Sequence, residues 1–277
     1  MSRPVRRLVM LLLAVLATLT LRTAAAHDFR VFTVVQDLSA TDESGRPPVV
    51  ARAATLFHAG KVYDYVDAAD EVTVFEPTQR RFRILSPSRG LVASVEFDEI
   101  NQLLKIAREE TEKQAAALTG ADPESVKAAA LLRFQLAPRF EEAFDDGGGT
   151  LTLDGGPLRY EVRTTDAGRA GVAAAYLEYA DWAARLNYLL HPGPVLPEPR
   201  LALNEALAAK GRLPILVTLR ADASPPLHLR AEHRTTLELN ARDRGMIHQW
   251  ETQLKSGATR QVTLRDYQRA VLTAEAR

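Results

Sequence analysis

The chain contains no cysteine. Disulfide bonds and thiolate metal sites are therefore excluded. The lipid anchor of bacterial lipoproteins is excluded as well, because it requires a cysteine at the cleavage site. A second long apolar run is also missing, since the one such run lies near the N-terminus. The remaining chain of about 250 residues must be stabilised by its own apolar core, and this length is sufficient to build one.

The sequence also lacks an excess of basic charge. It has 35 Lys and Arg residues against 35 Asp and Glu residues. Four of the arginines precede residue 27, which leaves 31 basic and 35 acidic residues in the remainder. A mildly negative balance argues against nucleic acid and against tight binding to anionic lipid headgroups, since both require concentrated positive charge. We expect no nucleic-acid partner.

The N-terminus has the pattern of an export signal. Basic residues open the chain, an apolar run spans 8–21, and three alanines at 24–26 precede His27. The run is shorter than the roughly 20 apolar residues of a spanning helix. We therefore predict a secretory signal peptide over 1–26, with an uncleaved membrane anchor as the alternative. The mature chain, 27–277, is then a single domain without a transmembrane segment, located in the periplasm or outside the cell.

The periodicity of the chain predicts an α+β fold. Short segments of β-forming residues, broken by turn formers at intervals of about ten residues, predict antiparallel strands. We expect strands over 28–36, 49–97, 139–165 and 215–239, and helices over 98–118, 122–136, 169–190, 199–210 and 240–254. Strands cluster together instead of alternating with helices, which favours a curved antiparallel sheet, open and half-barrel-like, covered by several helices. Asp98 and Asp122 are the expected N-caps of the first two helices.

Catalytic and cofactor-binding motifs are missing. The sequence has no G-x-S-x-G elbow, no P-loop, no H-E-x-x-H and no G-x-G-x-x-G. We assign no catalytic residue and expect no cofactor. This favours a protein that is not an enzyme.

The histidines are the remaining candidates for chemistry. His228 and His233 are five residues apart in a predicted strand, so they should point to opposite faces and occupy ordinary surface positions. Cleavage after residue 26 would make His27 the N-terminus, where the amine and the ring can chelate copper. His27 is thus a weak metal candidate, and chance is the alternative. An enzyme would require His58, His191, His228 or His233 beside buried carboxylates.

Two groups of aromatic residues are candidates for ligand binding. Tyr176, Tyr179 and Trp182 lie in the helix predicted over 169–190, and Tyr63 and Tyr65 lie in a predicted strand. Helices laid across a curved sheet often leave an apolar groove that such residues line. Packing of the aromatic stripe against the sheet is the alternative.

Two stretches carry a resemblance to known proteins. TLFHAGKVYDYVDAADEVTVFEPTQRRFRILSP (55–87) and YADWAARLNYLLHPG (179–193) resemble a family of uncharacterised exported bacterial proteins, over most of the mature chain. The first stretch is also similar to the periplasmic lipoprotein-carrier family. That resemblance implies an open half-barrel closed by helices, with a concave apolar cavity for acyl chains, and it brings no catalytic residues. The long helical middle departs from the carriers.

Three functional hypotheses follow from these observations. The first is an exported, non-enzymatic envelope protein that binds a hydrophobic ligand (a lipid or an acyl chain) or a protein partner on its curved sheet. The second is an envelope hydrolase or a copper-binding enzyme. The third is a structural component of the cell surface.

Overall fold

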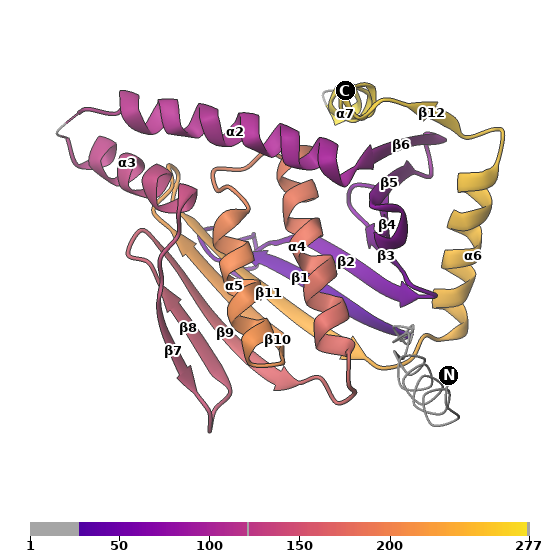
Figure 1. Ribbon diagram of the computed structural model, residues 1–277, viewed down its shortest axis with the longest axis horizontal. Helices are drawn as coiled ribbons and strands as arrows, with labels where there is room; N and C mark the ends of the chain where they lie inside the picture. Colours follow the sequence, from indigo (N-terminus) through magenta and orange to yellow (C-terminus); the bar gives the residue numbers. More distant parts are fainter. Residues whose placement is uncertain (1–27, 121, 276–277) are drawn as a thin grey trace, which may run out of the picture.

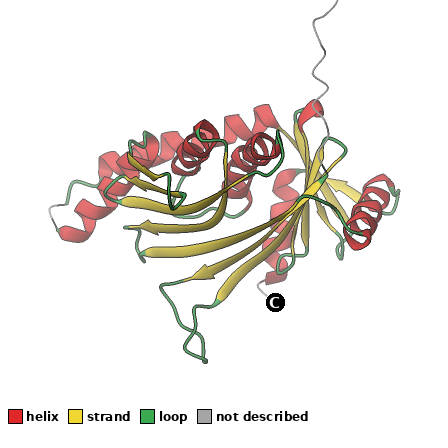
Figure 2. Ribbon diagram, turned by 90° about the horizontal axis from the view of Figure 1, so that it is seen from below, coloured by secondary structure: helices red, strands yellow, loops and turns green. Residues whose placement is uncertain are grey.

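The fold is known from a computed structural model that describes residues 28–120 and 122–275. All twelve strands of this part of the chain belong to one sheet, which is not closed. Figure 2 shows how the sheet curves, with helices gathered against it. The predicted α+β fold with an open, curved antiparallel sheet is confirmed. The expected signal peptide and His27 lie outside the described residues.

The elements follow one another in the order that the sequence patterns predict. The first strands and helices are β1 (Phe29–Asp37), β2 (Val49–His58), β3 (Lys61–Val66), β4 (Glu71–Glu76), β5 (Arg81–Ser86), β6 (Leu91–Glu96), α2 (Phe97–Ala117) and α3 (Pro123–Leu136), with a 3-10 turn at Pro77–Gln79. The second half contains β7 (Glu141–Asp145), β8 (Thr150–Asp154), β9 (Leu158–Asp166), α4 (Val172–Leu190), α5 (Glu198–Ala209), β10 (Arg212–Ala221), β11 (Leu227–Thr236), α6 (Ala241–Lys255), β12 (Arg260–Val262) and α7 (Leu264–Glu275). None of the described helices has the length and apolar character needed to cross a membrane.

The sheet joins two meanders at the middle. Its strand order is β12-β6-β5-β4-β3-β2-β1-β11-β10-β9-β8-β7. All neighbours are antiparallel except β12, which runs parallel to β6 at one edge. The pairing of β1 with β11, eight residue pairs long, brings two distant parts of the chain together. A sheet of this width must curve because its strands twist, and the curvature creates the space that the helices fill.

The sheet has an inner face and an outer face, each with its own apolar cluster. On the inner face, Phe57, Phe75 and Val162 pack with residues of α2, α4, α5 and α7. On the outer face, α6 covers β2–β6, and its Trp250 belongs to that second cluster. In Figure 1, α4 and α5 cross the inner face, whereas α6 lies at the right, beside β3–β6. Elsewhere the outer face carries exposed side chains, such as Phe32 and Arg163.

The helix starts agree with one of the two expected N-caps. Asp122 accepts a hydrogen bond from the backbone N–H of Ser125 at 2.9 Å, as expected for the cap of α3. Asp98 is not a cap. The helix α2 already starts at Phe97, because the chain passes from β6 directly into the helix without a turn. Asp98 lies in the first turn instead and pairs with Arg80 at 3.0 Å.

A network of charges fixes α6 to the outer face. Lys61 lies 2.9 Å from Glu76 of β4 and 2.8 Å from Glu251 of α6. The Tyr63 hydroxyl donates to Glu251 at 2.7 Å. Glu76 is almost fully buried and also accepts from Arg81 at 2.8 Å. These contacts satisfy carboxylates that the helix and sheet remove from water, so the network holds the two layers together.

Acid should therefore weaken the fold. Burial opposes ionisation of Glu251, but hydrogen bonds from Lys61 and Tyr63 outweigh it and lower its pKa to about 2. A carboxylate whose folded pKa is depressed stabilises the fold above its unfolded value near 4.5, and that stabilisation is lost as the pH falls toward 2. We expect the urea midpoint of unfolding to fall between pH 4.5 and 2. The Glu251→Gln variant should be less stable at pH 7 and lose less on acidification. An equal acid dependence in both proteins would contradict this assignment.

Candidate functional site

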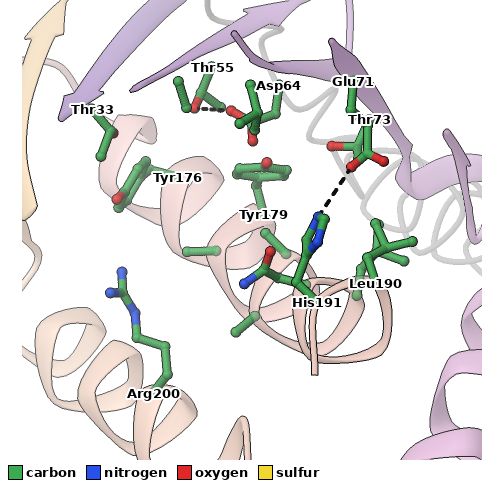
Figure 3. Close-up of a pocket in the computed structure, with 17 residues that line it drawn as sticks. Thr33, Thr55, Asp64, Glu71, Thr73, Tyr176, Tyr179, Leu190, His191 and Arg200 are labelled. Atoms are coloured by element: carbon green, nitrogen blue, oxygen red, sulfur yellow. Dashed lines mark hydrogen bonds and ion pairs between the residues drawn. The ribbon is translucent and has the colours of Figure 1, made fainter. Parts of the chain in front are cut away.

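A pocket of about 260 Å³ lies between the inner face of the sheet and the helices α4 and α5. Strands β1–β4 form one wall, and the other consists mainly of α4, with its C-terminal end and Arg200 of α5 (Figure 3). Its polar and charged lining residues are Thr33, Thr55, Asp64, Glu71, Thr73, Tyr176, Tyr179, Asn187, His191 and Arg200. The alanines of α4 are small and leave the space open. Because polar and charged residues line the rest, the lining is mixed rather than apolar.

Asp64 is the central acidic group of the sheet wall. Its position in β3 places it on the inner face opposite Thr73 of β4. Thr55 donates a hydrogen bond to Asp64 at 2.6 Å, and the Tyr179 hydroxyl forms a second one. Burial raises the pKa of Asp64 more than these bonds lower it, and the nearby charge of Glu71 raises it further. The carboxyl group therefore holds a proton more readily than an exposed aspartate.

Glu71 is the second carboxyl group of this wall. It starts β4 and lies diagonally across from Asp64 on adjacent strands. Its side chain is 6% exposed and accepts a hydrogen bond from the Tyr267 hydroxyl of α7 at 2.9 Å. His191, the C-terminal cap residue of α4, places its Nε2 3.8 Å from Glu71 Oε1 (Figure 3). Three elements that are distant in sequence thus meet at this carboxylate.

The opposite end of the pocket is basic. Arg200 extends from α5 toward Tyr176, with its guanidinium group facing the pocket (Figure 3). Its Nε donates to Asn204 Oδ1 at 3.0 Å, and Asn204 in turn donates to Asp181 at 2.8 Å. The guanidinium group also forms a hydrogen bond with the Tyr176 hydroxyl. Within residues 28–120 and 122–275, no carboxylate forms an ion pair with Arg200.

His233 lies beside the basic end. Its Nδ1 is 2.9 Å from the Thr33 hydroxyl, and its ring is 6.4 Å from that of Tyr176. Its Nε2 is buried and has no hydrogen-bond partner in the described structure. Burial and the charge of Arg200 lower the pKa of His233 to about 3, so the ring is neutral at pH 7. The surface position expected for His233 is therefore wrong, because its side chain points to the inner face of the sheet, toward Tyr176 of α4. His228, five residues earlier, is on the outer face as expected and contacts Arg220 at 3.2 Å.

Of the aromatic residues predicted to bind a ligand, the structure places Tyr176 and Tyr179 in the pocket. Trp182 stacks on Phe97 of α2, with ring centroids 3.7 Å apart, and does not line the pocket. Tyr63 and Tyr65 lie on the outer face, where both contact Trp250. Neighbouring positions in a strand face opposite sides, so Tyr63 and Tyr65 share the outer face while Asp64 between them faces inward.

The charged residues of the pocket were not predicted from the sequence, although one signal was present. Asp64 alternates with Tyr63 and Tyr65 and shares its phase with Val62 and Val66, so a carboxylate stands at an apolar position of a strand. Arg200 likewise shares a helix face with Leu203 and Leu207, both fully buried. An ionisable residue at a buried phase is a feature of functional sites. No set of three or more His, Asp or Glu residues in the described chain could hold a metal ion, and His27 is outside it.

Comparison with known proteins adds no relative. No protein-family model matches the chain, and a search of curated proteins finds no match. The function must therefore be argued from the pocket itself. Its geometry offers hydrogen-bond acceptors on the sheet wall, a guanidinium group at the other end, and aromatic hydroxyls between them.

Proposed function

We propose that this protein is an exported binding protein whose pocket, beneath α4, holds a small polar molecule. The observation that carries the proposal is that the carboxyl groups of Asp64 and Glu71 both face the pocket. A ligand that excludes water from these groups must replace the lost hydrogen bonds, because an unpaired buried polar group is unfavourable. Hydroxyl or amino groups of a polar ligand can do so.

The same reasoning disfavours an acyl chain in this pocket. The similarity to lipoprotein carriers implies an apolar cavity, but here the inner-face apolar cluster fills the space between the sheet and the helices. The pocket beneath α4 lies where polar residues gather. An alkyl chain would desolvate Asp64, Glu71 and Arg200 without providing partners. The ligand of this pocket therefore differs from that of a carrier, although the curved sheet is of the kind that the resemblance implies.

An envelope hydrolase is a second candidate, and it is favoured by one contact. The enzyme hypothesis requires a histidine beside a buried carboxylate, and His191 meets this condition at Glu71. A carboxylate can orient an imidazole that acts as a general base on water. The described pocket has threonines but no serine or cysteine in its lining, and a water molecule beside His191 is the nucleophile that this hypothesis invokes. Binding and catalysis would use the same pocket.

Mass measurements on the protein from its native envelope test the binding proposal. We expect the native mass to exceed the denatured mass by that of a polar molecule. Ala183 lines the pocket, so the Ala183→Phe variant should lose this difference. Ala174 lies on the exposed side of the same helix, and the matched variant Ala174→Phe should retain it.

Each other outcome has a defined meaning. An extra mass that belongs to a lipid would support the carrier hypothesis instead. A bare chain in every preparation would contradict the proposed function. If the released molecule is chemically altered after incubation with fresh protein, and is unaltered with Ala183→Phe, the pocket is that of an enzyme.

A further inference from the structure

The basic end of the pocket has a charge without an ion-pair partner among the described residues. Arg200 uses its Nε for Asn204 and contacts the Tyr176 hydroxyl, yet it has no carboxylate partner there. Guanidinium groups bind carboxylate and phosphate through a fork of parallel N–H donors. A guanidinium group that points into a pocket, and that has no ion-pair partner among the described residues, is therefore suited to binding an anionic group of a ligand (Figure 3).

A second feature at this end supports the same conclusion. His233 Nε2 is buried and unpaired, close to Tyr176 and within the electrostatic reach of Arg200. When the Thr33 hydroxyl donates to Nδ1, Nε2 of the neutral ring carries the proton and lacks an acceptor. Buried polar atoms in native proteins nearly always have a partner. His233 does not line the pocket itself, but its ring contacts Tyr176, which does, so an oxygen atom supplied from outside the chain to Nε2 would lie beside the basic end.

The acidic end, with its two carboxyl groups, is suited to a group of the opposite charge. The hydrogen bonds of Glu71 and Asp64 that the structure shows come from Tyr267, Thr55 and Tyr179, and none comes from a positively charged group. His191 Nε2 lies 3.8 Å from Glu71 Oε1 and carries a charge only when its ring is protonated. An ammonium group has three donors and would match the two carboxyl groups.

We propose that the ligand is a zwitterion, with an anionic group on Arg200 and an amino group at Asp64 and Glu71. This inference rests on the proposed function and specifies the chemical class of its ligand. One such molecule neutralises both ends of the pocket at once. An anion alone or an amine alone leaves the charge at one end of the pocket uncompensated. An uncharged alcohol leaves the charges at both ends uncompensated. The pocket therefore selects for opposite charges separated by a short apolar spacer, which lies against the alanines of α4.

A matched series of small molecules tests the charge requirement. The probes are ω-amino acids of four to eight carbons, with fatty acids, alkyl amines and alcohols of the same lengths, titrated calorimetrically into the ligand-free protein. We expect one length of amino acid to bind about ten- to a hundredfold more tightly than the matched acid or amine. Equal affinity across the four compound classes would overturn the inference, and so would the absence of binding by every amino acid.

Variants of Arg200 test whether the anionic group of the ligand binds at the basic end of the pocket. Arg200→Gln should remove the advantage of the amino acid over the amine, because the anionic group loses its partner. Arg200→Lys keeps the charge but not the fork, and should retain part of the advantage. Arg163→Gln changes an exposed arginine on the outer face and should behave as wild type. Should Arg200→Gln fail to fold, the lysine variant and the probe series still decide the matter.

The failure of this inference is distinguishable from failure of the proposed function. If the molecule released from the native protein is polar but not zwitterionic, the pocket binds a ligand of another class and only the inference falls. If the protein carries no molecule and binds no probe, both fall.

Discussion

Replacing Phe75 by alanine is expected to lower the free energy of unfolding by about 3–5 kcal/mol. Phe75 is 2% exposed and occupies the centre of an aromatic group on the inner face. Its ring lies 5.1 Å from Phe82, 5.6 Å from Phe97 and 5.8 Å from Tyr179. Truncation leaves a cavity among rings that cannot collapse together, because each belongs to a different element or strand. Urea unfolding followed by tryptophan fluorescence measures the loss.

The control for this variant is a phenylalanine of the same sheet in a different environment. Phe32 is 42% exposed on the outer face, so Phe32→Ala should change the free energy of unfolding by less than about 0.5 kcal/mol. Phe75→Ala should also weaken ligand binding, because Tyr179 loses a packing neighbour while holding Asp64. Similar stabilities for the two variants would contradict the packing described for the inner face.

Replacing Glu76 by glutamine is expected to destabilise the protein by about 3 kcal/mol. The Glu76 side chain is 3% exposed, and it pairs with Lys61 at 2.9 Å, Arg81 at 2.8 Å and Arg83 at 3.3 Å. Glutamine preserves the shape but removes the charge, which leaves three cations close together with Glu251 as the remaining partner of Lys61. The melting temperature at pH 7 reports the effect.

An exposed ion pair provides the comparison for Glu76. Asp98 pairs with Arg80 at the surface, where solvent screens the attraction. Asp98→Asn should therefore leave the melting temperature within experimental error. If Glu76→Gln is equally harmless, the charges beneath α6 contribute to the orientation of the helix and not to stability.

Local features of the fold were predictable from the sequence, whereas long-range features were not. Turn residues and period-two patterns determine hairpins such as β3–β4, because both strands are adjacent in the chain. The pairing of β1 with β11 depends on contacts about 200 residues apart, for which no local pattern exists. The position of α6 on the outer face was equally inaccessible, since an amphipathic helix shows that one side is buried but not against which face.

The pocket shows the same limit at the level of single residues. Tyr176 and Tyr179 were predictable because they share the buried stripe of one helix. Asp64 and Arg200 come from a strand and a helix more than 130 residues apart, and only the folded sheet brings them to one cavity. Tyr63 and Tyr65 were grouped with Tyr176 and Tyr179 because all four are aromatic. The strand positions of Tyr63 and Tyr65 nevertheless direct their side chains to the outer face.

The path of the chain after β11 has a consequence for the order in which the surroundings of the pocket are completed. The chain places α6 on the outer face, pairs β12 with the β6 edge and then lays α7 against the inner face, where Tyr267 holds Glu71. These residues follow every lining residue of the pocket in the chain, so a ribosome makes them later, and an export channel that threads the N-terminus first would deliver them later. Glu71 therefore gains its hydrogen bond from Tyr267 only after all the lining residues have been made. In a chain exported as we expect, the acidic end of the pocket would be the part completed late.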